Sequence, residues 1–344
     1  MAEPNHALSP FMGVALLSIE TSCDETSAAV VDGVAVRSNV VASQVGLHQK
    51  WGGVVPEAAA RAHVEAIVPV IREALEAAGM SLEDIRAVAV ANRPGLVGAL
   101  SVGVTAAKGI AFARQIPLIG VHHLEGHILS PLAESPNLPF PHVCLLVSGG
   151  HTEVIEVAAP GRYRVMGATR DDAAGEAFDK GARLLGLGYP GGKAVQDAAE
   201  AGRPGRYRLP RALKGEETFD MSFSGLKTAV LRLVESEGDR IDVPCAAAEL
   251  QEAIVDVLTD RAVRAAEAVG VDTVTLVGGV AANRRLRGRL GAECERRGWQ
   301  LFTPSFEMCT DNAAMIGIAG SFRLGAGERS DFDLDTLGND DLPR

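Results

Sequence analysis

The sequence holds 344 residues with a formal net charge of -11; 47% of them are hydrophobic and 4% aromatic. This length exceeds the size at which one hydrophobic core usually keeps growing, so two domains are expected. The acidic balance argues against a general, sequence-blind nucleic-acid binder, because such proteins need a basic surface.

Cysteine spacing and hydropathy indicate the compartment. The five cysteines form no CxxC pair, which favours a reducing environment over a disulfide framework or a structural zinc cage. Met1 to Phe11 lack a charged segment followed by an apolar one, and no uncharged apolar run reaches the roughly 18 residues of a membrane span. We therefore expect a cytoplasmic protein that is neither exported nor embedded in a membrane.

The first part of the chain alternates strand and helix patterns. The expected elements are strands at 14–20 and 28–36, a helix at 56–79, a strand at 86–91, a helix rich in small residues at 98–114 and a strand at 118–121. Asp32-Gly33 inside the second run is a hairpin signal, which adds a third strand before the first helix.

A second block begins after the proline-rich residues 136–142. It is expected to hold strands at 142–147 and 153–158, helices at 174–186, 192–201, 224–236 and 244–270, a strand at 273–277, a helix at 281–297 and a strand at 299–302. Strands precede helices in both blocks. The sequence thus predicts an α/β protein with two lobes of similar construction.

Three of the eight histidines lie within residues 122–127. If this segment is helical, His123 and His127 stand at i and i+4 on one face, where two imidazoles can bind one metal ion. In a metalloprotease HExxH helix the glutamate directly follows the first histidine. Here Glu125 lies about 200° around the helix from His123, away from the metal face.

A third ligand is needed, and Asp311 in Cys309-Thr310-Asp311-Asn312 is a candidate. This segment stands at the start of a terminal helix. Thr310 and Asp311 are also residue types that often cap helices. From spacing alone the capping interpretation is preferred.

Several glycine turns have the composition of ligand-binding loops. Ser148-Gly149-Gly150-His151-Thr152 lies between two strands, where backbone amides can form an anion-binding nest, although any tight turn also uses glycine. Leu276 to Asn283 run from a buried strand through Gly278-Gly279 into a helix, but do not match the GxGxxG fingerprint. Asp179 could bind ribose hydroxyls, or form a surface salt bridge with Lys180 or Arg183.

Two basic segments stand out on this acidic chain. They are Arg203, Arg206, Arg208, Arg211 and Lys214, and Arg284, Arg285, Arg287 and Arg289. Each is either a basic binding surface or an ordinary solvated loop and helix face.

Together these segments resemble the bacterial TsaD family along nearly the whole chain. The matching motifs are Glu20-Thr21-Ser22-Cys23-Asp24-Glu25-Thr26, Pro94-Gly95-Leu96, His123-Leu124-Glu125-Gly126-His127, Val147-Ser148-Gly149-Gly150-His151-Thr152, Gly175-Glu176-Ala177-Phe178-Asp179-Lys180, Tyr189-Pro190-Gly191-Gly192, Ser222-Phe223-Ser224-Gly225-Leu226-Lys227, Gly278-Gly279-Val280-Ala281-Ala282-Asn283 and Thr310-Asp311-Asn312. About a dozen residues before the first strand are a departure from the family pattern.

The resemblance implies the two-lobed actin, hexokinase and Hsp70 type of fold (ASKHA), with duplicated βββαβαβα units. The implied divisions are an N-terminal lobe of residues 12–135 plus 311–326, a C-terminal lobe of residues 136–310 and a polar tail at 327–344.

The resemblance also assigns site residues. It implies that the metal ligands are His123, His127 and Asp311, which reverses the capping interpretation of Asp311. The substrate-contacting positions carried over from the family are Leu146, Val147, Ser148, Gly149, Gly150, Asp179, Gly192 and Asn283. For the proton acceptor, Asp24 and Glu25 are candidates.

The implied enzyme is a tRNA N6-adenosine threonylcarbamoyltransferase. It would move the threonylcarbamoyl group from threonylcarbamoyl-AMP to N6 of the adenosine just 3′ of the anticodon in tRNAs that read ANN codons, with release of AMP. The implied cofactor is one divalent metal ion, Fe²⁺ in preference to Zn²⁺. The implied partners are a TsaB-like paralogue and a TsaE-like ATPase.

Other functions of this fold stay open at this point. A sugar-kinase-like enzyme would bind ATP with Mg²⁺ through acidic residues. A glycoprotease, the activity with which similar proteins have been labelled, would need a glutamate beside the metal. A protein that only binds partners would use the small-residue helix 98–114 as an association surface.

Overall fold

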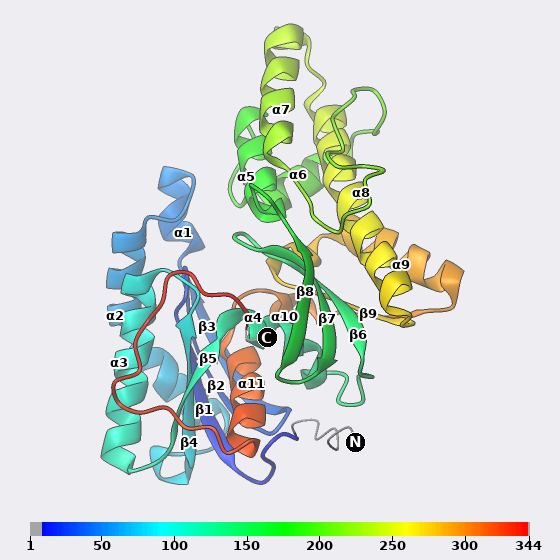
Figure 1. Cartoon of the computed structure of the whole chain (residues 1–344). Coiled ribbons are helices and arrows are strands. Elements are labelled where there is room, and N and C mark those ends of the chain that lie inside the picture. Colours follow the sequence, from blue (N-terminus) through cyan, green and yellow to red (C-terminus); the bar gives the residue numbers. More distant parts are fainter. Residues whose placement is uncertain (1–8, 343–344) are drawn as a thin grey trace. The chain divides into compact units, whose positions relative to one another are not determined.

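The computed structural model describes residues 9–342, so residues 1–8 of the unusual start and 343–344 of the predicted tail lie outside it. The chain forms two compact units. Of the described residues, the first unit takes 9–138, 158–163 and 310–342, and the second takes 139–157 and 164–309. Figure 1 shows the course of the chain through both units.

The first unit is built on a five-stranded sheet with the order β3-β2-β1-β4-β5. Its strands are β1 (Ala15–Glu20), β2 (Glu25–Asp32), β3 (Ala35–Ser43), β4 (Ala87–Arg93) and β5 (Leu118–His122). Strands β1, β2 and β3 pair antiparallel, while β4 is parallel to both β1 and β5. Gly33, at φ +62°, makes the predicted hairpin turn between β2 and β3.

Both faces of this sheet are covered by helices. The helices are α1 (Val45–His48), α2 (Pro56–Ala77), α3 (Val97–Arg114), α4 (His123–Leu129) and α11 (Ala313–Gly325), with short 3₁₀ turns at 49–51, 82–84 and 130–133. Leu17 and Ile19 face the core shared with α2 and α3. Because side chains alternate along a strand, Leu16 and Ser18 face the other way, against glycines of α11. Figure 1 shows α11 lying along β1 and β2.

The second unit repeats this plan. Its sheet has the order β10-β9-β6-β7-β8, which matches the first sheet strand for strand. Its elements are β6 (His142–Val147), β7 (Thr152–Ala159), β8 (Arg162–Ala168), α5 (Ala174–Leu184), α6 (Gly191–Ala199), α7 (Ser224–Glu237), a 3₁₀ turn at 238–240, α8 (Val243–Val269), β9 (Thr273–Val277), a 3₁₀ turn at 279–282 (η5), α9 (Arg284–Arg297), β10 (Gln300–Phe302) and α10 (Phe306–Cys309). The predicted duplicated α/β architecture is confirmed, although the sequence analysis missed β8 and the short helices α1 and α10.

The segment after α11 packs along the first unit. The backbone of Ser330 bridges to that of Leu118 in β5, and Ser330 Oγ accepts from the Gly120 amide at 2.9 Å. Asp340 forms an ion pair with Arg93 at 2.7 Å. The predicted polar tail therefore covers the outer strand of the first sheet.

Within residues 9–342, one helix has the length and apolar composition that could cross a membrane. This helix is α3, and its residues Leu100 and Val104 belong to the buried core beside β4. A core helix passes the same test of length and composition.

Candidate active site

The two histidines of the predicted metal face lie on α4, which begins directly after β5. The side chain of His122 caps this helix by accepting from the Leu124 amide at 3.3 Å. The rings of His123 and His127 meet edge to face, with their centroids 4.8 Å apart. The predicted placement of both rings on one helix face is confirmed.

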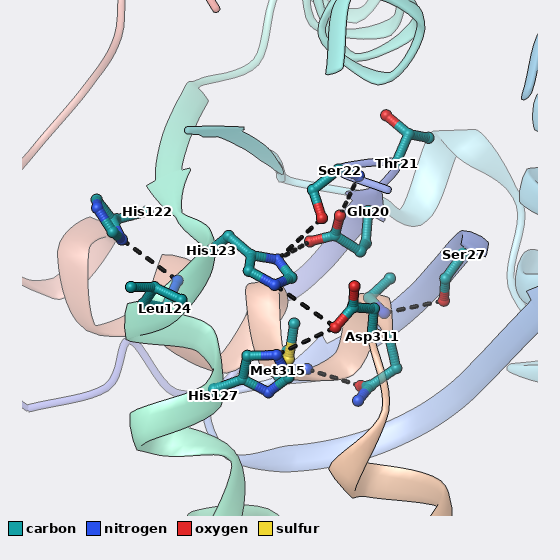
Figure 2. A network of polar contacts seen from close by, with 12 residues as sticks. Glu20, Thr21, Ser22, Ser27, His122, His123, Leu124, His127, Asp311 and Met315 are labelled. Carbon is teal, nitrogen blue, oxygen red and sulfur yellow. Dashed lines mark hydrogen bonds and ion pairs between the residues drawn. The ribbon is translucent and has the colours of Figure 1, made fainter. Parts of the chain in front are cut away.

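Asp311 turns toward these rings instead of capping α11. Its Oδ1 lies 3.1 Å from Nε2 of His127 and 3.5 Å from Nε2 of His123. The cap of α11 is Asn312, whose side chain accepts from the Met315 amide at 3.1 Å. The capping interpretation of Thr310 and Asp311 was therefore wrong. Figure 2 shows the carboxylate of Asp311 between the two rings.

These three residues fit a metal ion. One ligand atom from each lies within 4.8 Å of the others. Two imidazole nitrogens and one carboxylate are a donor set typical of catalytic zinc and non-haem iron centres, which keep a coordination position open for substrate. His123 and His127 are buried, while the side chain of Asp311 keeps 22% of its surface exposed, so the group is open on one side.

The electrostatics of the group favour a positive charge. Burial alone would raise the pKa of Asp311, but His123 and His127 lower it well below its usual range. Burial alone would lower the pKa of His123, but Asp311 and Glu20 raise it well above the usual range. Asp311 therefore stays ionised, and its negative charge stabilises a positive charge at the point where a cation would bind.

Two residues in contact with His123 were not assigned from the sequence. Glu20, at the end of β1, places Oε2 at 2.9 Å from Nδ1 of His123, and Ser22 Oγ lies 3.2 Å from the same nitrogen. Both belong to the Glu20–Thr26 motif, but nothing in the local pattern shows that β1 ends opposite α4. The only available signal was the presence of a glutamate in a buried strand that is otherwise apolar except for Ser18.

The candidate bases Asp24 and Glu25 lie close to the metal triad. Burial, Asp311 and Asp24 raise the pKa of Glu25 to about 9, so Glu25 beside these carboxylates holds a proton at neutral pH. Asp24 is also buried, with 8% of its surface exposed. The same carboxylates, together with burial, raise the pKa of the Cys23 thiol well above its usual range and keep it protonated.

Glu125 belongs to a separate buried network. Its carboxylate is paired with Arg323 of α11, whose Nε donates at 2.6 Å, and accepts from the Tyr163 hydroxyl at 3.0 Å. A glutamate engaged in this way holds no water beside a metal ion. The geometry therefore speaks against the glycoprotease alternative.

In the second unit, the predicted anion-binding loop is the turn between β6 and β7. The backbone amide of Ser148 donates to the His151 carbonyl at 2.8 Å, and Ser148 Oγ accepts from the His151 amide at 3.0 Å. Among the described residues, the amides of Gly149 and Gly150 donate to no other protein group. Leu146 and Val147 precede this turn as buried residues of β6.

Close backbone packing brings further predicted substrate positions to the same edge of the second sheet. A Cβ on Gly175 of α5 would lie 2.6 Å from the Ser148 carbonyl oxygen, and one on Gly278 would lie 2.4 Å from that of Val147. Asp179, on α5, accepts from the Gly191 amide at 2.7 Å beside the start of α6, where Gly192 is half-buried. Parallel strands β6 and β9 end at this edge, the usual ligand position in open α/β sheets.

Asn283 has a structural use that the sequence analysis did not anticipate. Its Oδ1 caps α9 by accepting from the Leu286 amide at 2.9 Å, and its Nδ2 donates to Gln251 at 2.9 Å. The residue is 8% exposed. Its predicted side-chain contact with substrate would therefore have to use either the oxygen that caps α9 or the amide group that already binds Gln251.

The two basic segments meet on one face of the second unit. Arg211 forms ion pairs with Glu249 and Asp256, and Arg289 lies 3.6 Å from the same Asp256. Arg211, Lys214 and Arg289 border a cavity of about 320 Å³ beside α8. Acidic side chains of α8 compensate much of this basic charge, as in ordinary surface ion pairs.

Comparisons with known proteins agree with these features. A family model described as "TsaD: tRNA N6-adenosine threonylcarbamoyltransferase" matches residues 35–318. A protein named tRNA N6-adenosine threonylcarbamoyltransferase from Syntrophotalea carbinolica is 51% identical over 331 residues, which cover 94% of this chain and 96% of that protein. The chain belongs to the TsaD family. A second TsaD-family relative, of the same name and from Symbiobacterium thermophilum, is 55% identical over 325 residues, with 94% and 95% of the two chains covered.

A solved structure shares the fold at greater distance. It is described as full-length HypF in the phosphate- and nucleotide-bound form, and it matches with a TM-score of 0.59 at 15% sequence identity. The match covers 93% of this TsaD-family chain and 47% of the HypF chain. At this identity the likeness supports the fold alone.

Proposed function

We propose that this chain transfers the threonylcarbamoyl group of threonylcarbamoyl-AMP to N6 of the adenosine just 3′ of the anticodon in tRNAs that read ANN codons. Its membership of the tRNA N6-adenosine threonylcarbamoyltransferase family over almost its full length carries this proposal. The amine nitrogen attacks the carbamoyl carbon, the bond to the phosphate oxygen breaks, AMP leaves, and the amine proton passes to a base. Because the mixed anhydride is already activated, catalysis rests on positioning and on stabilising developing negative charge.

The residues that would hold the cofactor are His123, His127 and Asp311. A divalent cation bound there would act as a Lewis acid toward the adenylate. We propose Fe²⁺, with Zn²⁺ as the alternative result of a metal analysis, since imidazole and carboxylate accept both ions. The chain contributes the fixed geometry: two rings on one turn of α4, and a carboxylate brought in by the segment before α11.

The adenylate would be held by residues of the second unit. Gly149 and Gly150, whose backbone amides have no acceptor among residues 9–342, would donate to its phosphate as anion-binding nests do. Asp179 is proposed to contact the ribose hydroxyls, with Leu146, Val147, Ser148, Gly192 and Asn283 as further contacts. Asp24 and Glu25 are the proposed proton acceptors. Glu25 would have to lose its proton before acting as one, because its pKa lies at about 9.

We also propose that the chain works in the cytoplasm with a TsaB-like paralogue and a TsaE-like ATPase. Support for a protein partner comes from α2 and α3, which pack together and expose Val64, Val68, Val97 and Phe112. Exposed apolar side chains on two adjacent helices are a feature of association surfaces.

The proposed function is tested by following label from threonylcarbamoyl-AMP into unmodified tRNA. The full chain is supplied with and without its partners, and AMP release is measured in parallel. We expect Asp311→Asn to lower transfer about 100-fold or more, the equivalent of several kcal/mol of Lewis-acid stabilisation. Asp197→Asn is the matched control, because Asp197 is an exposed carboxylate of α6 paired with Lys193.

Two results would contradict the proposal. Peptide-bond cleavage that depends on His123 and His127 would restore the glycoprotease alternative. ATP-dependent phosphoryl transfer to a sugar, without label in tRNA, would favour the kinase-like one.

A further inference from the structure

Glu20 is a completely buried carboxylate whose position in the sheet makes it face a metal-binding histidine. It ends β1 with none of its surface exposed. One carboxylate oxygen lies 2.9 Å from Nδ1 of His123, and the other accepts from the Ser22 amide. Figure 2 shows Glu20 and Asp311 on opposite sides of the His123 ring. A buried carboxylate lowers stability unless it is paired, so these contacts need an explanation.

The two ring nitrogens of His123 have different neighbours. Nδ1 faces Glu20 and Ser22, while Nε2 faces Asp311 at 3.5 Å. A carboxylate has only acceptor oxygens, so it requires the proton of the neutral ring to be on Nδ1. The lone pair is then on Nε2, the atom that points into the triad.

His127 provides an internal comparison. Its Nε2 lies 3.1 Å from Asp311, but its Nδ1 is buried and finds no partner among the described residues. Both rings project from one turn of α4, so helix geometry alone brings them together. Of the two rings, only that of His123 has a carboxylate at its Nδ1 atom.

We propose that Glu20 is the positioning residue of the metal centre: it fixes the Nδ1–H tautomer and the orientation of His123, so that Nε2 is the ligand atom. This inference rests on the proposed function, in which His123 binds a metal ion. Hydrogen-bond partners behind metal-bound histidines typically change metal affinity about 10- to 100-fold when they are removed.

Glu20→Gln tests the tautomer directly because its amide has one acceptor and one donor. If the amide oxygen keeps the Ser22 hydrogen bond, the NH₂ group faces Nδ1 of His123 and favours the opposite tautomer. If the amide is turned around, its NH₂ group faces the Ser22 N–H. The first orientation places the ring proton on the wrong nitrogen, and the second loses the hydrogen bond from Ser22 that orients residue 20.

The experiment measures Zn²⁺ affinity of the full chain by competition with a chelator. We expect Glu20→Gln to weaken Zn²⁺ binding about 10- to 100-fold. Glu125→Gln is the matched control, since Glu125 is a buried glutamate on the same helix as His123 but is paired with Arg323 and Tyr163. That control should destabilise the fold and leave Zn²⁺ affinity unchanged.

A second measurement needs no variant. In the Zn²⁺-loaded wild-type chain, ¹⁵N NMR of the imidazoles should show a proton on Nδ1 of His123 and zinc on Nε2. The reverse assignment overturns the proposal, as does an unchanged affinity of Glu20→Gln. If wild-type Zn²⁺ binding does not depend on His123 or Asp311, the metal centre of the proposed function fails instead.

Discussion

At the scale of single residues, the pairing of Glu125 with Arg323 links two helices that are distant in sequence. Arg323 also contacts Glu328 at 2.7 Å, and Glu125 also accepts from Tyr163. Arg323 is 9% exposed and Glu125 is 2% exposed. Opposite charges at such depth are held mainly by one another, and the removal of Glu125 leaves Arg323 with only the half-exposed Glu328 as a counter-charge.

We expect Glu125→Gln to lower the free energy of unfolding by about 3 kcal/mol, because it leaves Arg323 without its buried counter-charge. Chemical denaturation measures the change. The double variant Glu125→Met with Arg323→Met removes both charges and should regain most of the loss. A double variant as unstable as the sum of the two single ones would contradict this account.

The same residue scale shows what the sequence could reveal about the site. His123 and His127 were predictable because their spacing sets their geometry within one helix. Asp311 and Glu20 were not, because their partners lie far away in the sequence and only the folded sheet brings them together. The assignment of Asp311 as a metal ligand was implied by the family resemblance, while the structure identified Asn312 as the cap of α11.

At the scale of elements, Asp171 explains the Ser222–Lys227 motif before α7. Asp171 accepts from the amides of Phe223 and Ser224 at 2.8 and 3.0 Å, and from the hydroxyls of Ser222 and Ser224 at 2.6 and 2.8 Å. A carboxylate with these donors caps a helix N-terminus from outside the helix. The motif therefore has a structural role in starting α7.

This cap predicts a pH-dependent stability. Burial alone would raise the pKa of Asp171, but the hydrogen bonds from residues 222–224 lower it to about 2. Since the unfolded value is about 3.9, the stabilisation is present above about pH 5 and is lost as the pH falls toward 2. Solvent screening at this exposed side chain leaves about 1 kcal/mol.

Asp171→Asn should therefore be less stable than the wild type by about 1 kcal/mol at neutral pH and equally stable near pH 2. Urea unfolding across this range measures both. Asp197→Asn, at an exposed ion pair, should change stability by less than about 0.5 kcal/mol. If the difference in unfolding free energy between Asp171→Asn and the wild type did not depend on pH, the charge of Asp171 would not contribute to stability.

The strand that the sequence analysis missed, β8, lacks the apolar pattern of the inner strands. Strand β8 exposes Arg162 and Arg164 and lies at the edge of its sheet, so it has no continuous apolar run. The inner strands β1, β4, β6 and β9 are buried on both faces and were predicted from their apolar composition. Sequence patterns thus predict the sheet centres better than their edges.

At the scale of the whole molecule, the chain builds two units with the same arrangement of strands. Its C-terminal segment then packs on the first unit. The C-terminal segment covers β5, and Leu334 fills the space above Gly120, where a Cβ would lie 2.8 Å from Leu334 Cδ1. Leu337, by contrast, is 46% exposed. An outer strand of a sheet otherwise presents unpaired backbone groups to other chains.

We expect Leu334→Ser to lower the free energy of unfolding by about 1–2 kcal/mol, because it removes apolar contact with the first core. Leu337→Ser in the same segment should change it by less than about 0.5 kcal/mol. Differential scanning calorimetry compares the two. Equal effects would mean that the segment does not pack specifically.

The return of the chain also sets the order of events during synthesis. Asp311 follows the entire second unit in the sequence, whereas His123 and His127 precede it. A ribosome therefore makes two of the three ligands before the second unit and the third only after it. The complete triad can bind a cation only once the second unit has been synthesised.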